Sequence, residues 1–225
     1  MVRITKVHTG GGDGGETSLV DGTRIAKSDL RMEMVGTCDE LNACLGIVAM
    51  EANRLNEIAE DGGARPTVRQ VRNVISKVIG RLHHELFDLG AELACPKDSL
   101  PEYMVLIDQD CSDRLCEEMD AWNEELEPLS SFILPSGSST ITALHLSRTV
   151  TRRLERAMVA MKDELRPLTL QYINRLSDWI FILIRWTSSR LGEEETLWLP
   201  LGKRMEGQAE NIRRQKANKD EINEI

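Results

Sequence analysis

Residues 148–156 read Arg-Thr-Val-Thr-Arg-Arg-Leu-Glu-Arg, a charged patch within a long stretch of helical apolar periodicity. Arg148, Arg152 and Glu155 are spaced i, i+4 and i+7, so a helix places them on one face. Apolar residues follow the same period on a neighbouring stripe: Ile141, Leu144, Leu154, Met158 and Met161. Charges beside a buried seam are costly unless they pair with each other or with a charged ligand. The patch therefore indicates either a binding site for a charged ligand or a solvated ladder of ion pairs on an exposed helix.

The same helical period recurs along the chain and predicts four more helices. Apolar spacing, capping residues and Gly or Pro breakers place the five helices at about residues 31–59, 67–94, 109–126, 139–163 and 167–191. Aromatic residues make up only 4% of the chain, while Leu, Glu, Arg, Met and Ala are plentiful, which favours helices over strands. We expect an all-α fold, a five-helix bundle with ferritin-like up-and-down packing.

Length, charge and cysteine content narrow the class of protein. The 225 residues suffice for one core, and we expect a single domain over 1–191 with a charged, flexible tail over 192–225. The net charge of −9 argues against a nucleic-acid-binding protein. Five scattered cysteines without a Cys-x-x-Cys pair indicate a reducing compartment, and neither a targeting segment nor a membrane-spanning run is evident. We expect a cytoplasmic protein that binds neither nucleic acid nor a membrane.

A glycine-rich segment, Thr-Gly-Gly-Gly-Asp-Gly-Gly-Glu-Thr-Ser-Leu, occupies residues 9–19 and predicts a loop with exposed amides. Its glycines fit G-x-G-x-x-G, but no βαβ unit follows, and Glu16 stands where a P-loop needs lysine. The backbone N–H groups, with the Thr17 and Ser18 hydroxyls, are nevertheless suited to an anion. Asp13 is suited to orient the loop or to help hold a phosphate-bound cation. A merely flexible loop is the alternative interpretation.

Three further polar sites have both a functional and a plain interpretation. Asp39 lies near an apolar seam in the first predicted helix, but a surface aspartate has the same pattern. Asn174 and Asp178 share one face of the last predicted helix, with large apolar residues around them. The pair at 83–84, His-His, lacks the spacing of a zinc or di-iron motif, so we expect surface histidines.

Four blocks, in this order, resemble the PduO-type corrinoid adenosyltransferase family: residues 9–19, 27–42, 132–156 and 174–178. A weaker fifth block covers residues 86–94, and the resemblance extends from residue 3 to about 191. It implies transfer of the 5′-deoxyadenosyl group of ATP to the Co(I) of cobalamin, giving adenosylcobalamin and triphosphate. The alternative is a non-catalytic carrier or regulator that binds ATP or a corrinoid on the same fold.

The resemblance also implies site residues. Those expected to bind ATP, whose phosphates mainly hold the Mg²⁺ ion, are Thr9, Gly10, Gly11, Gly12, Asp13, Thr17, Ser18, Lys27, Arg152, Arg153, Leu154, Glu155, Arg156 and Asn174. Arg148 corresponds to an arginine that pairs across a subunit interface with the aspartate matching Asp39, which implies a homotrimer with active sites between subunits. Phe132 matches an aromatic residue that covers the lower face of the corrin. The expected catalytic group is therefore Arg152, Asp39, Arg148 and Phe132.

The resemblance further implies two protein partners, a corrinoid reductase and an adenosylcobalamin-dependent enzyme. The loop also departs from the family. Gly10 and Gly11 replace the second and third residues of the usual Thr-Lys/Arg-Thr-Gly-Asp sequence, with the loss of one cation and one hydroxyl. Lys6 and Arg24 are the nearby cations available to compensate.

Overall fold

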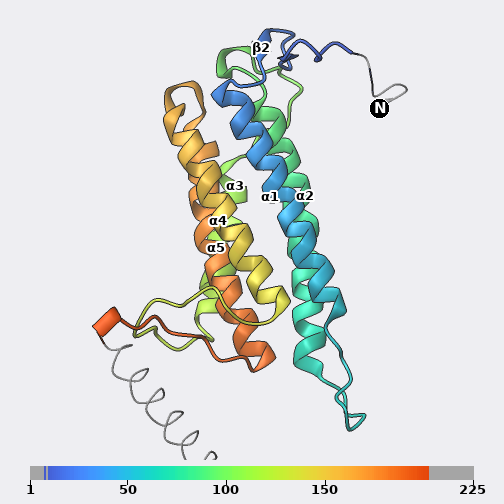
Figure 1. Ribbon diagram of the computed structural model, residues 1–225, viewed down its shortest axis with the longest axis vertical. Coiled ribbons are helices and arrows are strands. Elements are labelled where there is room, and N and C mark those ends of the chain that lie inside the picture. The colour runs from blue at the N-terminus through green and yellow to red at the C-terminus, as the bar shows by residue number, and fades with distance from the viewer. Residues whose placement is uncertain (1–7, 9, 203–225) are drawn as a thin grey trace, which may run out of the picture.

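The computed structural model describes residue 8 and residues 10–202, and it contains the five expected helices (Figure 1). They are α1 (Leu30–Arg54), α2 (Pro66–Leu93), α3 (Gln109–Asn123), α4 (Ser139–Ala160) and α5 (Pro167–Leu191), with short 3₁₀ helices η1 (Lys97–Ser99) and η2 (Lys162–Glu164). Successive helices run in opposite directions along the bundle (Figure 1). This confirms the predicted all-α, up-and-down bundle.

Local chemistry explains where most helices begin and end. The Asp29 side chain caps α1 by accepting from the Arg31 amide at 2.8 Å, and Asp108 caps α3 in the same way. Proline occupies the first position of both α2 and α5, where its missing N–H costs nothing. Gly192, with φ of 70°, ends α5 in the left-handed region.

The predicted ends of three helices are wrong by a few residues. Helices α1, α3 and α4 end at residues 54, 123 and 160, before the expected 59, 126 and 163. After α1 the chain leaves the helical region at Leu55 and forms a bridge between Ile58 and Ala64. Tertiary pairing across this connector therefore outweighs the helical propensity of its sequence.

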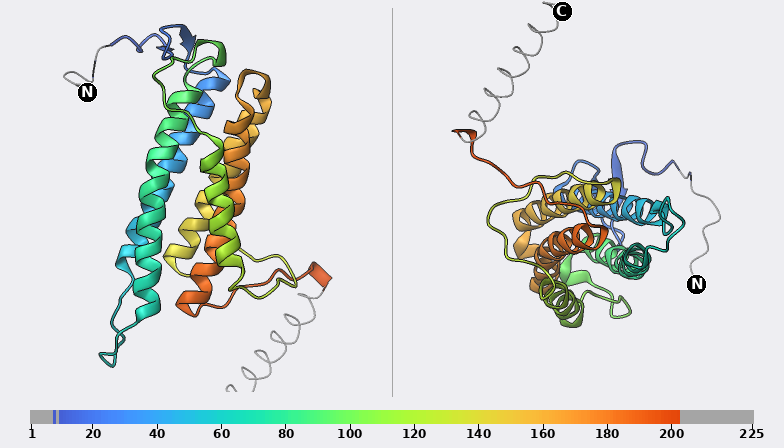
Figure 2. Two further views of the ribbon diagram at one scale, coloured as in Figure 1. Left: turned by 180° about the vertical axis from the view of Figure 1, so that it is seen from behind. Right: turned by 90° about the horizontal axis from the view of Figure 1, so that it is seen from below.

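The core lies mainly around α5. Helix α5 contributes Tyr172, Trp179 and Trp186, which are among the largest fully buried side chains. Viewed along the bundle, α5 lies between α4 and α3, while α1 and α2 run side by side (Figure 2). The Trp122 ring of α3 packs against both tryptophans of α5, with ring centroids 5.3 and 5.8 Å apart. No described helix has the length and apolarity needed to span a membrane.

Each end of the bundle carries an additional element that is relevant to function. At one end, β1 (Glu16–Ser18) and β2 (Arg24–Ala26) form an antiparallel hairpin beside the start of α1 (Figure 1). The expectation of an irregular loop is thus correct for residues 10–15 and wrong for 16–18, where backbone pairing fixes a short strand. At the other end, residues 132–134 pair with residues 196–198 of the expected tail, while residues 203–225 lie outside the described residues.

Candidate functional site

The glycine-rich loop closes onto Lys27. Gly10 and Gly15 have φ of 73° and 84°, and two turns join Asp13 N to Gly10 O and Gly15 N to Gly12 O, each at 3.2 Å. Lys27 N donates to Gly15 O at 2.8 Å, and a Cβ added to Gly12 would lie 3.0 Å from Lys27 Nζ. The structure therefore brings together the loop and the lysine that were predicted to share a site. Thr9 and Lys6 lie outside the described residues.

A second cation reaches the same loop. The Arg24 guanidinium donates to the Gly11 carbonyl at 2.9 Å and to the Ser18 hydroxyl at 3.3 Å, and it faces Glu16 at 3.5 Å. Sequence reasoning named Arg24 only as a nearby cation. The hairpin register, which pairs Ser18 with Arg24, places the Arg24 side chain beside the loop. Strands of three residues are too short for the sequence to reveal this pairing.

The charged patch of α4 forms a second group of polar side chains, which continues onto α5. Asn174 Nδ2 donates to Glu155 Oε1 at 2.8 Å, so two predicted ATP-binding residues meet directly. Arg152 and Arg156 are exposed and make no ion pair among the described residues, whereas Arg153 pairs with Glu40 of α1.

Leu154 lies in the same patch but is fully buried, so its side chain holds α4 against the core. The guanidinium groups of Arg152 and Arg156, exposed and unpaired among the described residues, give this face of α4 a positive charge, which is suited to a ligand with several anionic groups.

Arg148 is half-buried and packs on an aromatic ring rather than standing in a solvated ladder. Its guanidinium carbon lies 5.2 Å from the centre of the Phe181 ring, and its buried Nε has no hydrogen-bond partner among the described residues. Burial, and then the charge of Arg152, lowers the pKa of Arg148, while Asp178 acts in the opposite direction. These contacts contradict the solvated-ladder interpretation for Arg148.

Asp39 and Arg148 are not brought together within one chain. Asp39 is exposed on α1, and no ion pair or hydrogen bond joins it to Arg148 among the described residues. Likewise, no hydrogen bond or ion pair links the glycine-rich loop with the patch on α4 and α5 in the described part of the chain. A single chain thus presents the predicted site as separate parts.

Phe132 lies at the far end of the bundle from the hairpin and is 79% exposed. Trp198 covers one edge of it: the rings stand edge to face at 6.4 Å, and Trp198 N donates to Phe132 O at 2.7 Å. Exposed apolar neighbours Leu134, Leu197 and Leu199 extend this surface. An apolar patch of this kind marks a binding surface. Sequence reasoning missed Trp198, although it lies in an apolar run, residues 197–201, that follows the last helix after a short polar stretch.

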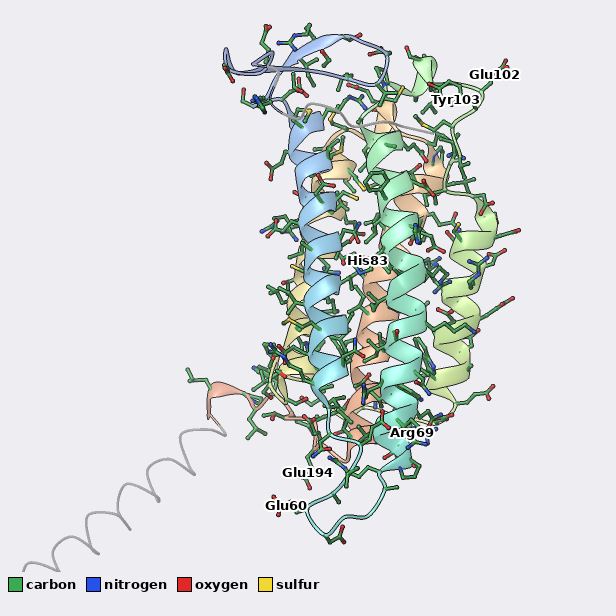
Figure 3. All side chains as sticks on the ribbon, turned by 90° about the vertical axis from the view of Figure 1, so that its right-hand side faces the viewer. Glu60, Arg69, His83, Glu102, Tyr103 and Glu194 are labelled. Atoms are coloured by element: carbon green, nitrogen blue, oxygen red, sulfur yellow. The ribbon has the colours of Figure 1, made fainter. Side chains whose placement is uncertain are left out.

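His83 helps to join α1 and α2. Figure 3 shows it between α1 and α2, where its Nδ1 faces the Asn42 side-chain oxygen and its carbonyl accepts from Asn42 Nδ2 at 3.2 Å. The expectation of two surface histidines is therefore correct for the exposed His84 and only partly correct for His83, which is half-buried. This pairing could not be read from the sequence, because the two residues are 41 positions apart.

Comparison with known proteins now decides the family. The family described as cobalamin adenosyltransferase matches residues 7–187. The chain belongs to the cobalamin adenosyltransferase family. The corrinoid adenosyltransferase of Mycobacterium leprae is 37% identical to this adenosyltransferase-family chain over 209 residues, which cover 89% of this chain and 99% of the relative. That of Bacillus subtilis is 35% identical over 189 residues, covering 83% and 89%.

Solved structures agree with the sequence comparison. A variant of the PduO-type ATP:corrinoid adenosyltransferase from Lactobacillus reuteri, complexed with cobalamin and ATP, matches with a TM-score of 0.74 and 28% identity. The match covers 87% of this chain and all of that one. These findings confirm the family resemblance that the sequence blocks indicated.

Proposed function

We propose that the protein transfers the 5′-deoxyadenosyl group of ATP to the Co(I) of cobalamin, releasing triphosphate. The observation that carries the proposal is the structural match to the Lactobacillus reuteri enzyme, whose complex contains both cobalamin and ATP. The two polar groups and the apolar surface described above supply the chemistry that such a reaction needs.

The reaction is a nucleophilic substitution at the ribose 5′ carbon. The corrinoid substrate provides the electron pair for the new Co–C bond, and the C–O bond to the triphosphate breaks. The chain must then hold the two substrates in line and stabilise the charge that gathers on the leaving group. Lys27, the amides of residues 10–12 and 14, and Arg152 are suited to that second task, together with the Mg²⁺ ion that ATP carries. No proton needs to be removed, so no general base is required.

The separation of the site within one chain supports a homotrimer with active sites between subunits. Asp39 is exposed on the same α1 face as Ile47 and Met50, large apolar residues that are each 44% exposed. A face of this kind is suited to a subunit contact. The half-exposed guanidinium of Arg148, which makes no ion pair among the described residues, would then pair with Asp39 of a neighbouring subunit.

Phe132 is assigned to the corrinoid half of the site. Its exposed ring, backed by Trp198, presents an apolar surface suited to cover the lower face of the corrin and to exclude water from it. The Co(I) state also requires an electron donor, which makes a corrinoid reductase the expected partner upstream. An adenosylcobalamin-dependent enzyme is the expected partner downstream.

An anaerobic assay tests the proposal by following the absorbance of cob(I)alamin with and without ATP. We expect ATP-dependent loss of cob(I)alamin and release of inorganic triphosphate in equal amounts. Arg152→Ala should abolish turnover without changing the oligomeric state, because Arg152 is exposed and outside the core. Binding of ATP and corrinoid without Co–C bond formation would instead identify a carrier or regulator.

A further inference from the structure

Arg24 is a second positive charge at the glycine-rich loop, and the reaction proposed above gives it no role. It begins β2, opposite Ser18 in the hairpin, and its side chain crosses back over the loop. Its two terminal nitrogens contact the Gly11 carbonyl, the Ser18 hydroxyl and the Glu16 carboxylate. The side chain remains 44% exposed, so a ligand on the loop has access to its charge.

The charged ends of Arg24 and Lys27 reach two consecutive residues of the loop. The Lys27 ammonium lies against Gly12, and the Arg24 guanidinium contacts the carbonyl of Gly11. Two cations beside exposed amides match an anion with several charged oxygens, because a guanidinium forms paired bonds with phosphate oxygens that an ammonium cannot. A polyphosphate chain is the ligand chemistry that this arrangement fits.

The contact with Glu16 is the weakest of the three. At 3.5 Å it is the longest, and the Glu16 side chain is 60% exposed, so water screens the ion pair. A phosphate oxygen of ATP can therefore replace the carboxylate at little cost, whereas the bond to the Gly11 carbonyl at 2.9 Å can persist. Glu16 stands where a P-loop has its lysine, so it brings no positive charge of its own to the loop. Its ion-pair partner is Arg24.

We propose that Arg24 is a second triphosphate-binding cation beside Lys27, and that Glu16 holds its guanidinium until ATP replaces the carboxylate. This inference rests on the proposed function and deepens its nucleotide half. It identifies Arg24 as the residue that supplies the positive charge missing at Gly10.

Steady-state adenosylation with Arg24→Ala, Arg24→Lys and Glu16→Gln tests the assignment. Losing a charge-assisted hydrogen bond costs affinity of about tenfold or more, so Arg24→Ala should raise the KM for ATP by at least that factor. The KM for cob(I)alamin should not change, and Arg24→Lys should recover part of the loss because it restores the charge without the paired donors. An unchanged KM for ATP in Arg24→Ala would overturn the inference, whereas wild-type turnover would still support the proposed function.

Glu16→Gln distinguishes a role of Arg24 in binding ATP from a role only in stabilising the loop. It frees the guanidinium, so it should lower the KM for ATP in the wild-type background and have no effect in Arg24→Ala. An equal effect in both backgrounds would refute the part assigned to Glu16. The matched control is Arg69→Ala, since Arg69 is also an exposed arginine paired with a glutamate but lies at the other end of the bundle (Figure 3). We expect it to leave both KM values unchanged.

Calorimetric titration with inorganic triphosphate provides a readout that does not depend on turnover. Arg24→Ala should weaken this binding by about the same factor as it raises the KM for ATP. Binding that depends on Arg24 in a protein without adenosylation activity would refute the proposed function and sustain the inference. Equal binding by wild type and Arg24→Ala would overturn the inference.

Discussion

Replacing Arg31 with methionine is expected to destabilise the bundle at the end that carries the glycine-rich loop. The Arg31 side chain is buried, and its Nη1 donates to the carbonyl oxygens of Leu93 at 3.0 Å and Cys95 at 3.2 Å. Its Nη2 pairs with Glu164 at 2.6 Å. The two carbonyls lie at the C-terminal end of α2, where no intrahelical donors remain. Arg31 therefore joins the start of α1 to the end of α2.

The magnitude follows from these contacts. Methionine fills part of the space of the aliphatic stem but donates no hydrogen bond. Each buried carbonyl left without a donor costs about 1–3 kcal/mol, so the free energy of unfolding should fall by about 2–6 kcal/mol. The ion pair adds under about 1 kcal/mol, because Glu164 is exposed to water. Urea unfolding followed by circular dichroism, at one fixed protein concentration, measures the change.

Glu164→Gln is the matched control for Arg31→Met. It removes the ion pair and leaves both carbonyl bonds in place, so we expect a loss under about 1 kcal/mol. If Arg31→Met costs no more than Glu164→Gln, the two carbonyl bonds do not contribute as argued, and the reasoning is refuted.

Three further predictions concern other parts of the molecule. Asp39→Arg and Arg148→Asp should each impair cobalamin use, and their combination should recover part of it in the anaerobic assay; no recovery would contradict pairing between subunits. Phe132→Ala should lower turnover with cob(I)alamin and leave the KM for ATP unchanged, and an altered KM for ATP alone would argue against its corrinoid role.

Burial, and then the charge of Asp39, raises the pKa of the Cys38 thiol from 9.0 to about 12. The unfolded chain therefore releases this proton first, and wild type should lose stability relative to Cys38→Ala between pH 9 and 12, by up to about 1.4 kcal/mol per pH unit in urea unfolding.

The helices could be predicted because their signals are local. A stripe such as Val71, Ile75 and Val78, a cap such as Asp29 and a breaker such as Pro66 each act within a few residues of the helix that they define. The end of α1 escaped prediction, because the bridge between Ile58 and Ala64 closes a connector that the sequence pattern leaves helical. The hairpin escaped for the same reason, since pairing rather than propensity fixes three-residue strands.

The parts of the site differ in the same way. The meeting of Glu155 with Asn174 follows from helical spacing once α4 and α5 are neighbours. The contact of Phe132 with Trp198 joins residues 66 positions apart without any local signal, so only the structure reveals it. Placing Asp39 beside Arg148 requires a second copy of the chain, and it stays a prediction.

The buried residues of α4 determine which way its charged side chains point. Val150, Leu154 and Met158 are buried at i, i+4 and i+8, and Arg152 and Arg156 are exposed at positions about half a turn away. A shift of two residues in the register of α4 would turn Arg152 into the bundle, where an unpaired charge is not tolerated. The burial of Leu154 thus fixes the direction of the arginines on either side of it.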